Sequence, residues 1–347
     1  METILCHAHT EPDGSLGRPA LETLAAAKIL ADALGGGKLI VGLVGGEVQT
    51  AANSLAVCGA ARFLGVSGAD FGQPRYASDA AAAEAICRAA GATLVLAPTT
   101  SRWSRILPGV AQRLSGRIDT HVTGISVSDG KLSIARWYYR QRMEAVLTRA
   151  QRPWVVLLDP GCQEPWQGTA GTATVEGLSV VLPETCRRTQ VTGVQAPPVD
   201  QQTIRPDAEV LFVAGAGWTK TQADGQVHSA DAETLILDFL RKTKASLGGS
   251  KSLVDLSGEG QATLRFMTHL NQIGQTGATP RHPKGLSTCC HGEEPHVVGW
   301  RFVTERRAVN LDPNCGWARG KADVLYVADA FEVMRRVNSL LGESSGK

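Results

Sequence analysis

The feature that most constrains the fold is a regular alternation of short apolar runs with alanine-rich stretches in the first hundred residues. The apolar runs have the length of strands, and the stretches between them are rich in strong helix formers. Alternation of this kind predicts a parallel sheet with helices on both faces. The expected strands are 2–8, 38–44, 61–66 and 92–98, and the expected helices are 20–34, 50–60 and 77–91.

The rest of the chain predicts a second α/β domain. Residues 119–158 read as further strands, which completes an N-terminal α/β domain over 1–187. Residues 188–205 are rich in Pro, Gln and Thr and form the best linker candidate. We expect a doubly wound α/β domain over 206–341 and a disordered tail over 342–347.

Within the second domain, the pattern is less regular. The residues predict a helix over 232–247, a strand over 252–256, a helix over 261–273 and a last helix over 330–341. The domain is expected to open with a strand in 209–217, and further strands are expected around 297–303, 306–310 and 322–327.

Charge and cysteine content narrow the class of protein. The formal net charge of +2 is too small to indicate nucleic-acid binding. The eight cysteines contain no CxxC pair, which favours free thiols in a reducing compartment. The polar N-terminus does not read as a signal peptide, and no apolar run reaches the length of a membrane span. We therefore expect a cytoplasmic protein that does not itself span a membrane.

The densest group of reactive side chains is CCHGEEPH, residues 289–296. Cys290, His291 and His296 could supply three ligands to a metal ion, with Cys315 as a fourth. The same segment could also form the rim of a cofactor pocket. GAGWTK (215–220) lacks the third glycine of a dinucleotide fingerprint and is a weak signal by itself.

Four stretches carry a resemblance to a known family. NQIGQTG (271–277) offers backbone N–H groups and amide side chains of the kind that bind a pyrophosphate. It resembles the QVGQTG loop of the α subunit of electron transfer flavoproteins. LGGSKSLVD (247–255), RRAVNLDP (306–313) and ADVLYVADAFEVM (322–334) resemble three further stretches of that family in the same order. In this register, 289–296 falls on a segment that wraps the flavin.

The resemblance implies an FAD site and assigns roles within it. His296 would face the N1–C2 carbonyl edge of the flavin, and Lys251 would lie over the ring, where a positive charge favours the reduced form. Asn310 and Asp329 would hold the adenosine end. The positions that match the family's cofactor-binding residues are Ser250, Lys251, Gln275, Thr276, Gly277, His291, His296, Asn310 and Asp329.

The sequence departs from the family at two of these positions and at others near them. Lys251 stands where the family has an arginine, and His291 stands where it has a serine. Ala216 stands where the family has an arginine that contacts FAD. Pro295 replaces a glutamine, and Glu293 and Glu294 add negative charge beside the expected phosphate site. A protein that keeps the fold but has lost or altered flavin binding, acting as a structural or binding subunit, is therefore the alternative.

The implied function is electron transfer without conversion of a substrate. The chain would be the α subunit of a heterodimer whose β subunit can carry AMP. It would take electrons from a flavin-dependent dehydrogenase, of the acyl-CoA or methylated-amine type, and pass them to a membrane quinone oxidoreductase or a similar acceptor. The linker would let the FAD domain reorient between partners.

Overall fold

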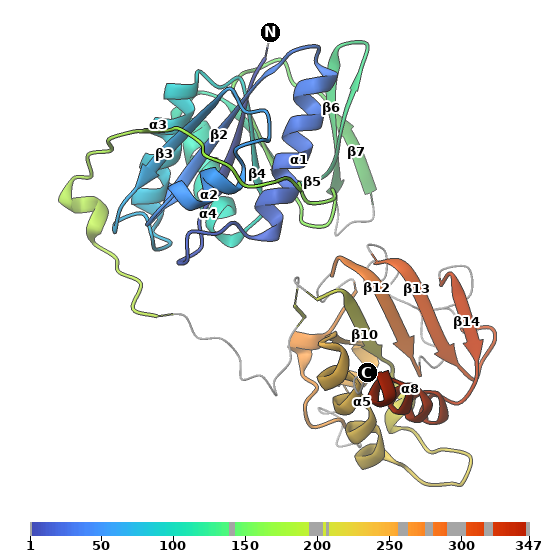
Figure 1. Cartoon of the computed structure of the whole chain (residues 1–347). Helices are drawn as coiled ribbons and strands as arrows, with labels where there is room; N and C mark the ends of the chain where they lie inside the picture. The colour runs from blue at the N-terminus through green and yellow to red at the C-terminus, as the bar shows by residue number, and fades with distance from the viewer. Residues whose placement is uncertain are drawn as a thin grey trace. The chain divides into compact units, whose positions relative to one another are not determined.

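The computed structural model describes residues 2–138, 143–193, 204–205, 208–255, 263–274, 280–289, 303–315 and 322–344. It divides into two compact units, Met1–Val194 and Gln195–Lys347, each drawn with its own sheet in Figure 1. The expected fold class is confirmed, because both units combine helices with a mainly or wholly parallel sheet. The exact limits that the sequence suggests for domains and linker stay predictions.

Unit 1 is built on a nine-stranded sheet in the order β7-β6-β5-β8-β4-β1-β2-β3-β9. The strands from β5 to β9 in this order are parallel, whereas β6 pairs antiparallel with both β5 and β7. The strands are β1 (Thr3–His9), β2 (Lys38–Gly45), β3 (Arg62–Ser67), β4 (Leu94–Pro98), β5 (Arg117–Ser128), β6 (Lys131–Tyr138), β7 (Met143–Leu147), β8 (Trp154–Leu158) and β9 (Val175–Gly177).

Helices cover both faces of this sheet, as the alternation predicts. Side chains of α1 (Arg18–Ala33) and α2 (Gln49–Ser54) join one apolar core, and those of α3 (Tyr76–Ala90) and α4 (Ser101–Arg113) join the other. The alanines let these helices approach the sheet closely, and eight residues of α3 are buried. Gly91 ends α3 in the left-handed conformation, with φ 59°, which glycine adopts without strain.

Unit 2 is built on a five-stranded parallel sheet in the order β11-β10-β12-β13-β14. Its helices α5 (Ser229–Thr243) and α8 (Ala330–Ser344) are labelled in Figure 1. Their side chains contribute to one apolar core that also includes Phe212 and Ala214 of β10. The strands are β10 (Val210–Ala214), β11 (Ser246–Gly249), β12 (His282–Thr288), β13 (Val303–Asn310) and β14 (Val324–Val327).

One prediction for unit 2 is wrong at its end, and two others are wrong. The helix expected over 232–247 is present as α5 but ends at Thr243, because Lys244 turns left-handed and the chain enters strand β11. The residues expected as a strand over 252–256 form helix α6 (Lys251–Asp255), in whose first turn the Ser250 Oγ accepts a hydrogen bond from the Leu253 N–H at 3.3 Å. The described part of the helix expected over 261–273 holds only the short 3-10 turn η4 (His269–Asn271).

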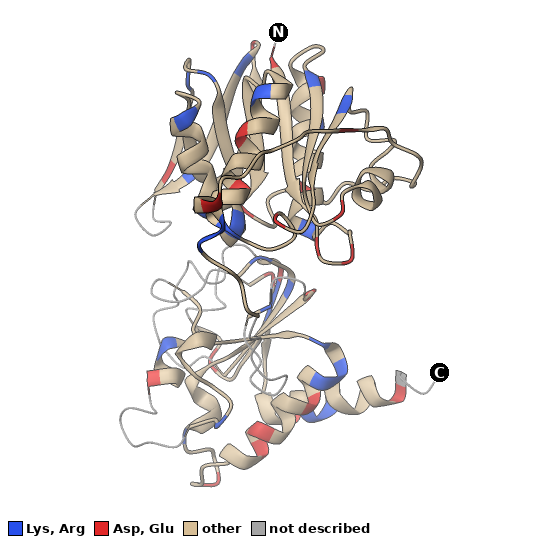
Figure 2. Cartoon of the chain, turned by 90° about the vertical axis from the view of Figure 1, so that its left-hand side faces the viewer, with Lys and Arg blue, Asp and Glu red and all other residues tan. Residues whose placement is uncertain are grey.

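Charges of both signs are spread over the described surface, as Figure 2 shows. On α5 and α8, Asp238 pairs with Lys242 at 2.7 Å, and Asp231 pairs with Arg335 at 2.8 Å.

None of the helices within the described ranges combines the length and the apolar character needed to cross a bilayer.

Candidate functional site

The topology of unit 2 marks one place for a ligand. From β10 the chain crosses to β11 on one side and later returns to β12 on the other side, so the order of strands reverses between β10 and β12. In open parallel sheets, ligands bind outside the carboxyl ends of the strands at such a reversal. The segments that follow β10, β12, β13 and β14 all lie at this edge.

The segment after β10 is held against the end of β12 by three hydrogen bonds. The Gly215 N–H donates to the Thr288 carbonyl at 2.8 Å, and the Gly217 N–H donates to the Cys289 carbonyl at 2.9 Å. The indole Nε1 of buried Trp218 donates to Thr288 Oγ1 at 2.9 Å. This fixes the short 3-10 turn η2 (Ala216–Thr219), so the GAGWTK motif forms a rigid wall and not a glycine-rich phosphate loop.

A small hollow of about 30 Å³ opens where these segments meet. Its lining combines polar groups with alanine, leucine and phenylalanine side chains. The described residues that line it are Gly217, Gln222, Cys289, Asn310, Leu311, Ala328, Asp329, Ala330 and Phe331. The site thus joins parts of the chain that are more than one hundred residues apart.

Asn310 and Asp329, two of the predicted cofactor-binding residues, come together in this hollow. Asn310 ends β13, is buried, and accepts a hydrogen bond at Oδ1 from the Asp312 N–H at 2.9 Å. Asp329 follows β14 and accepts the Glu332 N–H at Oδ1 at 3.0 Å, in the first turn of α8. Both side chains are therefore oriented by the backbone that follows them.

Cys289 lies at the base of the same hollow in an unusual backbone conformation. Its φ is 56°, a region that a residue with a Cβ rarely adopts. Burial raises the pKa of its thiol, and the negative charge of Asp329 raises that pKa further. The thiol is therefore protonated at neutral pH and is not prepared to act as a nucleophile.

Ser250 and Lys251 lie at the carboxyl end of β11, on the far side of β10 from the hollow. Ser250 is buried, and its N–H donates to the Ala214 carbonyl at 2.9 Å. The Lys251 ammonium is about half exposed and pairs with Asp255 one turn along α6. The structure thus places these two residues at the same sheet edge as Asn310 and Asp329 but separates the two pairs.

The remaining predicted residues, Gln275, Thr276, Gly277, His291 and His296, lie outside the described residues. So does Cys290, which the metal hypothesis requires. Among the side chains that the structure does describe, no three His, Cys, Asp or Glu are grouped to hold a metal ion. The metal hypothesis stays a prediction.

Sequence reasoning missed Gln222 as a site residue. The only local signal is the QADG turn that it begins, in which the Gly225 N–H donates to the Gln222 carbonyl at 3.0 Å and Gly225 has φ 78°. Nothing in that turn indicates that Gln222 faces residues that follow β12, β13 and β14.

Unit 1 contains a buried histidine and cysteine that could be mistaken for a catalytic pair. His7 Nε2 lies 3.4 Å from Cys87 Sγ, and both residues are buried. Burial lowers the pKa of His7 to about 4 and raises the pKa of Cys87 to about 12. Both side chains are neutral at pH 7, so the pair forms part of the core and not an activated thiolate.

The fold and this site define a class, a two-unit α/β protein with a ligand hollow at the switch point of its second sheet. A family model gives the family: the electron transfer flavoprotein domain matches residues 5–183, more than half of the chain. The chain therefore belongs to the electron transfer flavoprotein family. Comparison with curated proteins yields no match. The family match lies within unit 1, and the hollow of unit 2 lies outside it.

Proposed function

We propose that this chain is the FAD-binding α subunit of a heterodimeric electron transfer flavoprotein. The observation that carries the proposal is the meeting of Asn310 and Asp329 in one hollow at the switch point of a parallel sheet, in a chain of this family. Two positions chosen by resemblance alone, nineteen residues apart in sequence, share a pocket.

The described residues fit an extended dinucleotide along the carboxyl edge of unit 2. Asn310 and Asp329 would hold the nucleoside end, and Ser250 and Lys251 would contact the flavin end. From β11 to β14 the sheet spans four strand spacings, roughly 19 Å at about 4.8 Å each. When bound, FAD would supply one-electron redox chemistry, and the protein would supply orientation and fixed charge.

The partners follow from the family and are part of the proposal. A β subunit, with AMP as its ligand, would complete the heterodimer, and a flavin-dependent dehydrogenase of the acyl-CoA or methylated-amine type would donate electrons. A membrane quinone oxidoreductase or a similar protein would accept them. The complex would work in the cytoplasm, with residues 188–205 as the hinge between units.

One alternative has specific support. Ala216 provides no cation where the family has an arginine, and its side chain is buried in the core of unit 2. This observation favours a chain that keeps the fold and serves as a structural or binding subunit with lost or altered flavin binding.

A visible absorption spectrum of the chain, purified together with a co-expressed β subunit, separates the two hypotheses. The proposal expects a flavin spectrum that dithionite bleaches, whereas a colourless complex that takes up no added FAD would refute it. Metal analysis of the same sample tests Cys290, His291 and His296 as ligands. Asp329→Asn should retain the α8 cap but weaken FAD binding several-fold, from the loss of one charged hydrogen-bond acceptor.

A matched control is available on the same strand. Asp323 precedes β14, at the opposite end of that strand from Asp329, and its carboxylate accepts the Arg306 N–H at 2.6 Å. Asp323→Asn removes an equal charge away from the hollow and should leave FAD affinity unchanged. Equal losses from both variants would indicate a general effect of charge and would count against a contact at Asp329.

A further inference from the structure

Gln222 is fixed in one orientation by the loop that it closes. Its Nε2 donates to the Gly217 carbonyl at 3.0 Å and to the Lys220 carbonyl at 2.6 Å. Two carbonyl oxygens can face only the NH₂ end of an amide, so the positions of Oε1 and Nε2 are determined by their neighbours. Both amide hydrogens are used, and the Gln222 side chain is left with Oε1 as an acceptor.

Asp329 supplies a second acceptor in the same hollow. Its Oδ1 accepts the Glu332 N–H at the start of α8, and within the described residues Oδ2 has no hydrogen-bond donor. None of the described residues that line the hollow is Lys or Arg. The described lining therefore offers two side-chain oxygen acceptors and no Lys or Arg, which favours a ligand group that donates hydrogen bonds over a phosphate.

The size of the hollow restricts the group further. A volume of about 30 Å³ holds roughly two water-sized groups, since one water needs about 10–15 Å³ on this measure. Two adjacent hydroxyls meet both requirements, whereas an adenine ring, whose amino group could donate hydrogen bonds, is too large for a volume of about 30 Å³. The apolar side chains of Leu311 and Phe331 at its wall suit the carbon skeleton that would carry the two hydroxyls.

We propose that Gln222 is a specificity-determining residue of this site: its Oε1 and Asp329 Oδ2 accept hydrogen bonds from the two hydroxyls of a ribose diol. The inference rests on the proposed function, because it assigns the nucleoside half of the bound cofactor to this hollow. It adds a contact from the loop after β10, which selects for a ribonucleoside over the same molecule without its hydroxyls.

The test compares two probes, adenosine and 2′,3′-dideoxyadenosine, titrated calorimetrically into the full-length chain in complex with its β subunit, with AMP saturating the partner. Wild type should bind adenosine about 10-fold more tightly than the dideoxy compound, as expected for two hydrogen bonds of ordinary net strength. In Gln222→Met, which has similar length and no acceptor, that preference should fall to about 3-fold or less, because only the Asp329 contact remains.

Two further variants separate a ligand contact from a structural role. Gln226→Met changes an exposed glutamine in the same turn and should leave the preference intact. Gln222→Glu places carboxylate oxygens against the Gly217 and Lys220 carbonyls, so it should release the loop and lose the preference as well. A Gln222→Met variant that still prefers adenosine as strongly as wild type would overturn the inference, as would a wild type with no preference.

Binding of FAD is measured in a separate experiment, by the visible absorption spectrum of the flavin. If wild type prefers adenosine but takes up no FAD, the contact at Gln222 stands and the proposed function fails. If wild type binds FAD and Gln222→Met keeps the full preference for the diol, the proposed function stands and this inference fails. A wild type that binds neither nucleoside nor FAD refutes both.

Discussion

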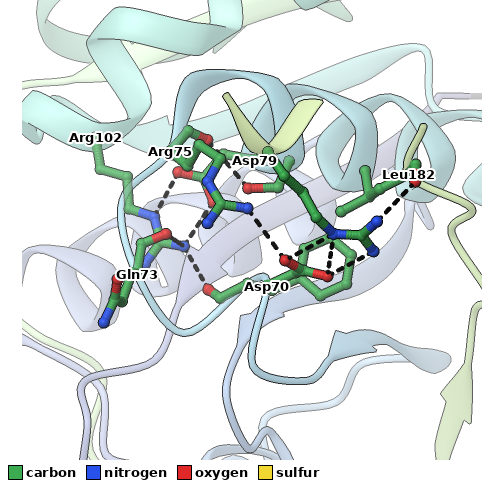
Figure 3. Close-up of polar contacts among 9 residues, drawn as sticks. Asp70, Gln73, Arg75, Asp79, Arg102 and Leu182 are labelled. Carbon is green, nitrogen blue, oxygen red and sulfur yellow. Dashed lines mark hydrogen bonds and ion pairs between the residues drawn. The ribbon is translucent and has the colours of Figure 1, made fainter. Parts of the chain in front are cut away.

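The buried ion pair between Arg102 and Asp79 offers the most demanding test of how unit 1 is held together. Figure 3 shows the two side chains pointing toward each other, with Arg102 Nε 2.8 Å from Asp79 Oδ2 and Nη2 2.6 Å from Oδ1. Asp79 is 1% exposed and Arg102 is 8% exposed. The guanidinium also donates to the Phe71 carbonyl at 2.5 Å, which ties α4, α3 and the loop after β3 together.

Arg102→Met removes the cation and retains most of the apolar side chain. It leaves the Asp79 carboxylate buried without its partner, which costs about 3–5 kcal/mol in comparable cases. That is a large share of the roughly 5–15 kcal/mol that holds a typical domain folded. With a urea m-value of about 2 kcal/mol/M, the midpoint of unfolding of unit 1 should fall by about 1.5–2.5 M.

Hydrogen exchange with mass spectrometry, followed on peptides from β1 and β4 at increasing urea, measures the opening of unit 1 in the intact chain. The double variant Arg102→Met with Asp79→Leu is the control. It removes the stranded carboxylate and should recover most of the loss, except for about 1–3 kcal/mol from the unpaired Phe71 carbonyl. A single variant within 1 kcal/mol of wild type would refute the argument.

The pH dependence gives an independent check of the same reasoning. Burial raises the pKa of the Asp79 carboxyl, and Arg102 opposes that rise. Without Arg102, the folded-state pKa rises further above the unfolded value of about 3.9. The folded variant then binds a proton more readily than the unfolded chain, so its stability is lost as the pH rises through the folded pKa and returns below it. The deficit of Arg102→Met should therefore shrink toward pH 4, whereas a deficit independent of pH would contradict this account.

Three further predictions follow from other contacts. Asp119 accepts hydrogen bonds from Arg149, Arg136 and the Trp154 indole. Burial alone would raise the pKa of its carboxyl, but these partners keep that pKa below its usual value. Its stabilisation is therefore present above about pH 4 and lost as the pH falls through the folded pKa, and Asp119→Asn should flatten the acid limb of a stability–pH curve measured by thermal unfolding. Asp70→Asn breaks a partly exposed pair with Arg187 and should leave the stability of unit 1 nearly unchanged, yet trypsin should then cut faster after Arg187, as mass spectrometry of the fragments would show. An unchanged cleavage rate would mean that the pair does not hold this segment. Lys251→Ala should fold normally, because the ion pair of Lys251 is about half exposed. It should shift the reduction potential of the proposed flavin by tens of mV in a spectroelectrochemical titration. An unchanged potential would mean that Lys251 does not contact the flavin.

The sequence predicts the strands and helices of unit 1 well, because the alternation of apolar and alanine-rich stretches agrees with how these elements pack in the structure. Each expected strand overlaps an observed one, and nearly all positions of β2 and β4 are buried, as in a parallel sheet covered on both faces. The expected helices begin or end within a few residues of the observed ones, except that α2 stops at Ser54. Ala-rich helices between strands leave few other ways to bury the apolar runs.

Unit 2 was harder to predict around residues 244–256 because tertiary contacts override the local preference there. Residues 246–249 (SLGG) pair with β10 as a strand, and their two glycines let the backbone lie close to neighbouring side chains. A Cβ at Gly249 would lie 2.2 Å from Met267 Cε, and one at Gly248 would lie 2.9 Å from Ile273 Cγ2. The apolar residues that follow read equally well as a strand or as a short helix, and Ser250 decides for the helix through its side chain.

The sequence indicates Asn310 and Asp329 by resemblance alone, and the structure places each at or just after the end of a parallel strand, at the carboxyl edge of the sheet. Gln222 has no such signal, because its position depends on two backbone carbonyls within an irregular loop and on hydrogen bonds from that loop to β12. The spacing of apolar residues along the sequence carries no information about such contacts.

The arrangement of charge along the carboxyl edge of unit 2 bears on how a dinucleotide would lie there. The β13–β14 end presents oxygen acceptors from Asp329 and Gln222, and the β11 end presents the Lys251 ammonium, whose charge Asp255 partly neutralises. A ligand with hydroxyls at one end and an electron-accepting ring at the other is favoured in one direction only, because the reverse would put developing negative charge beside Asp329. Since Lys251 is about half exposed and already paired, the acceptors in the hollow contribute more to this preference than the cation does. The orientation of the proposed cofactor would therefore be decided mainly where its ribose would bind.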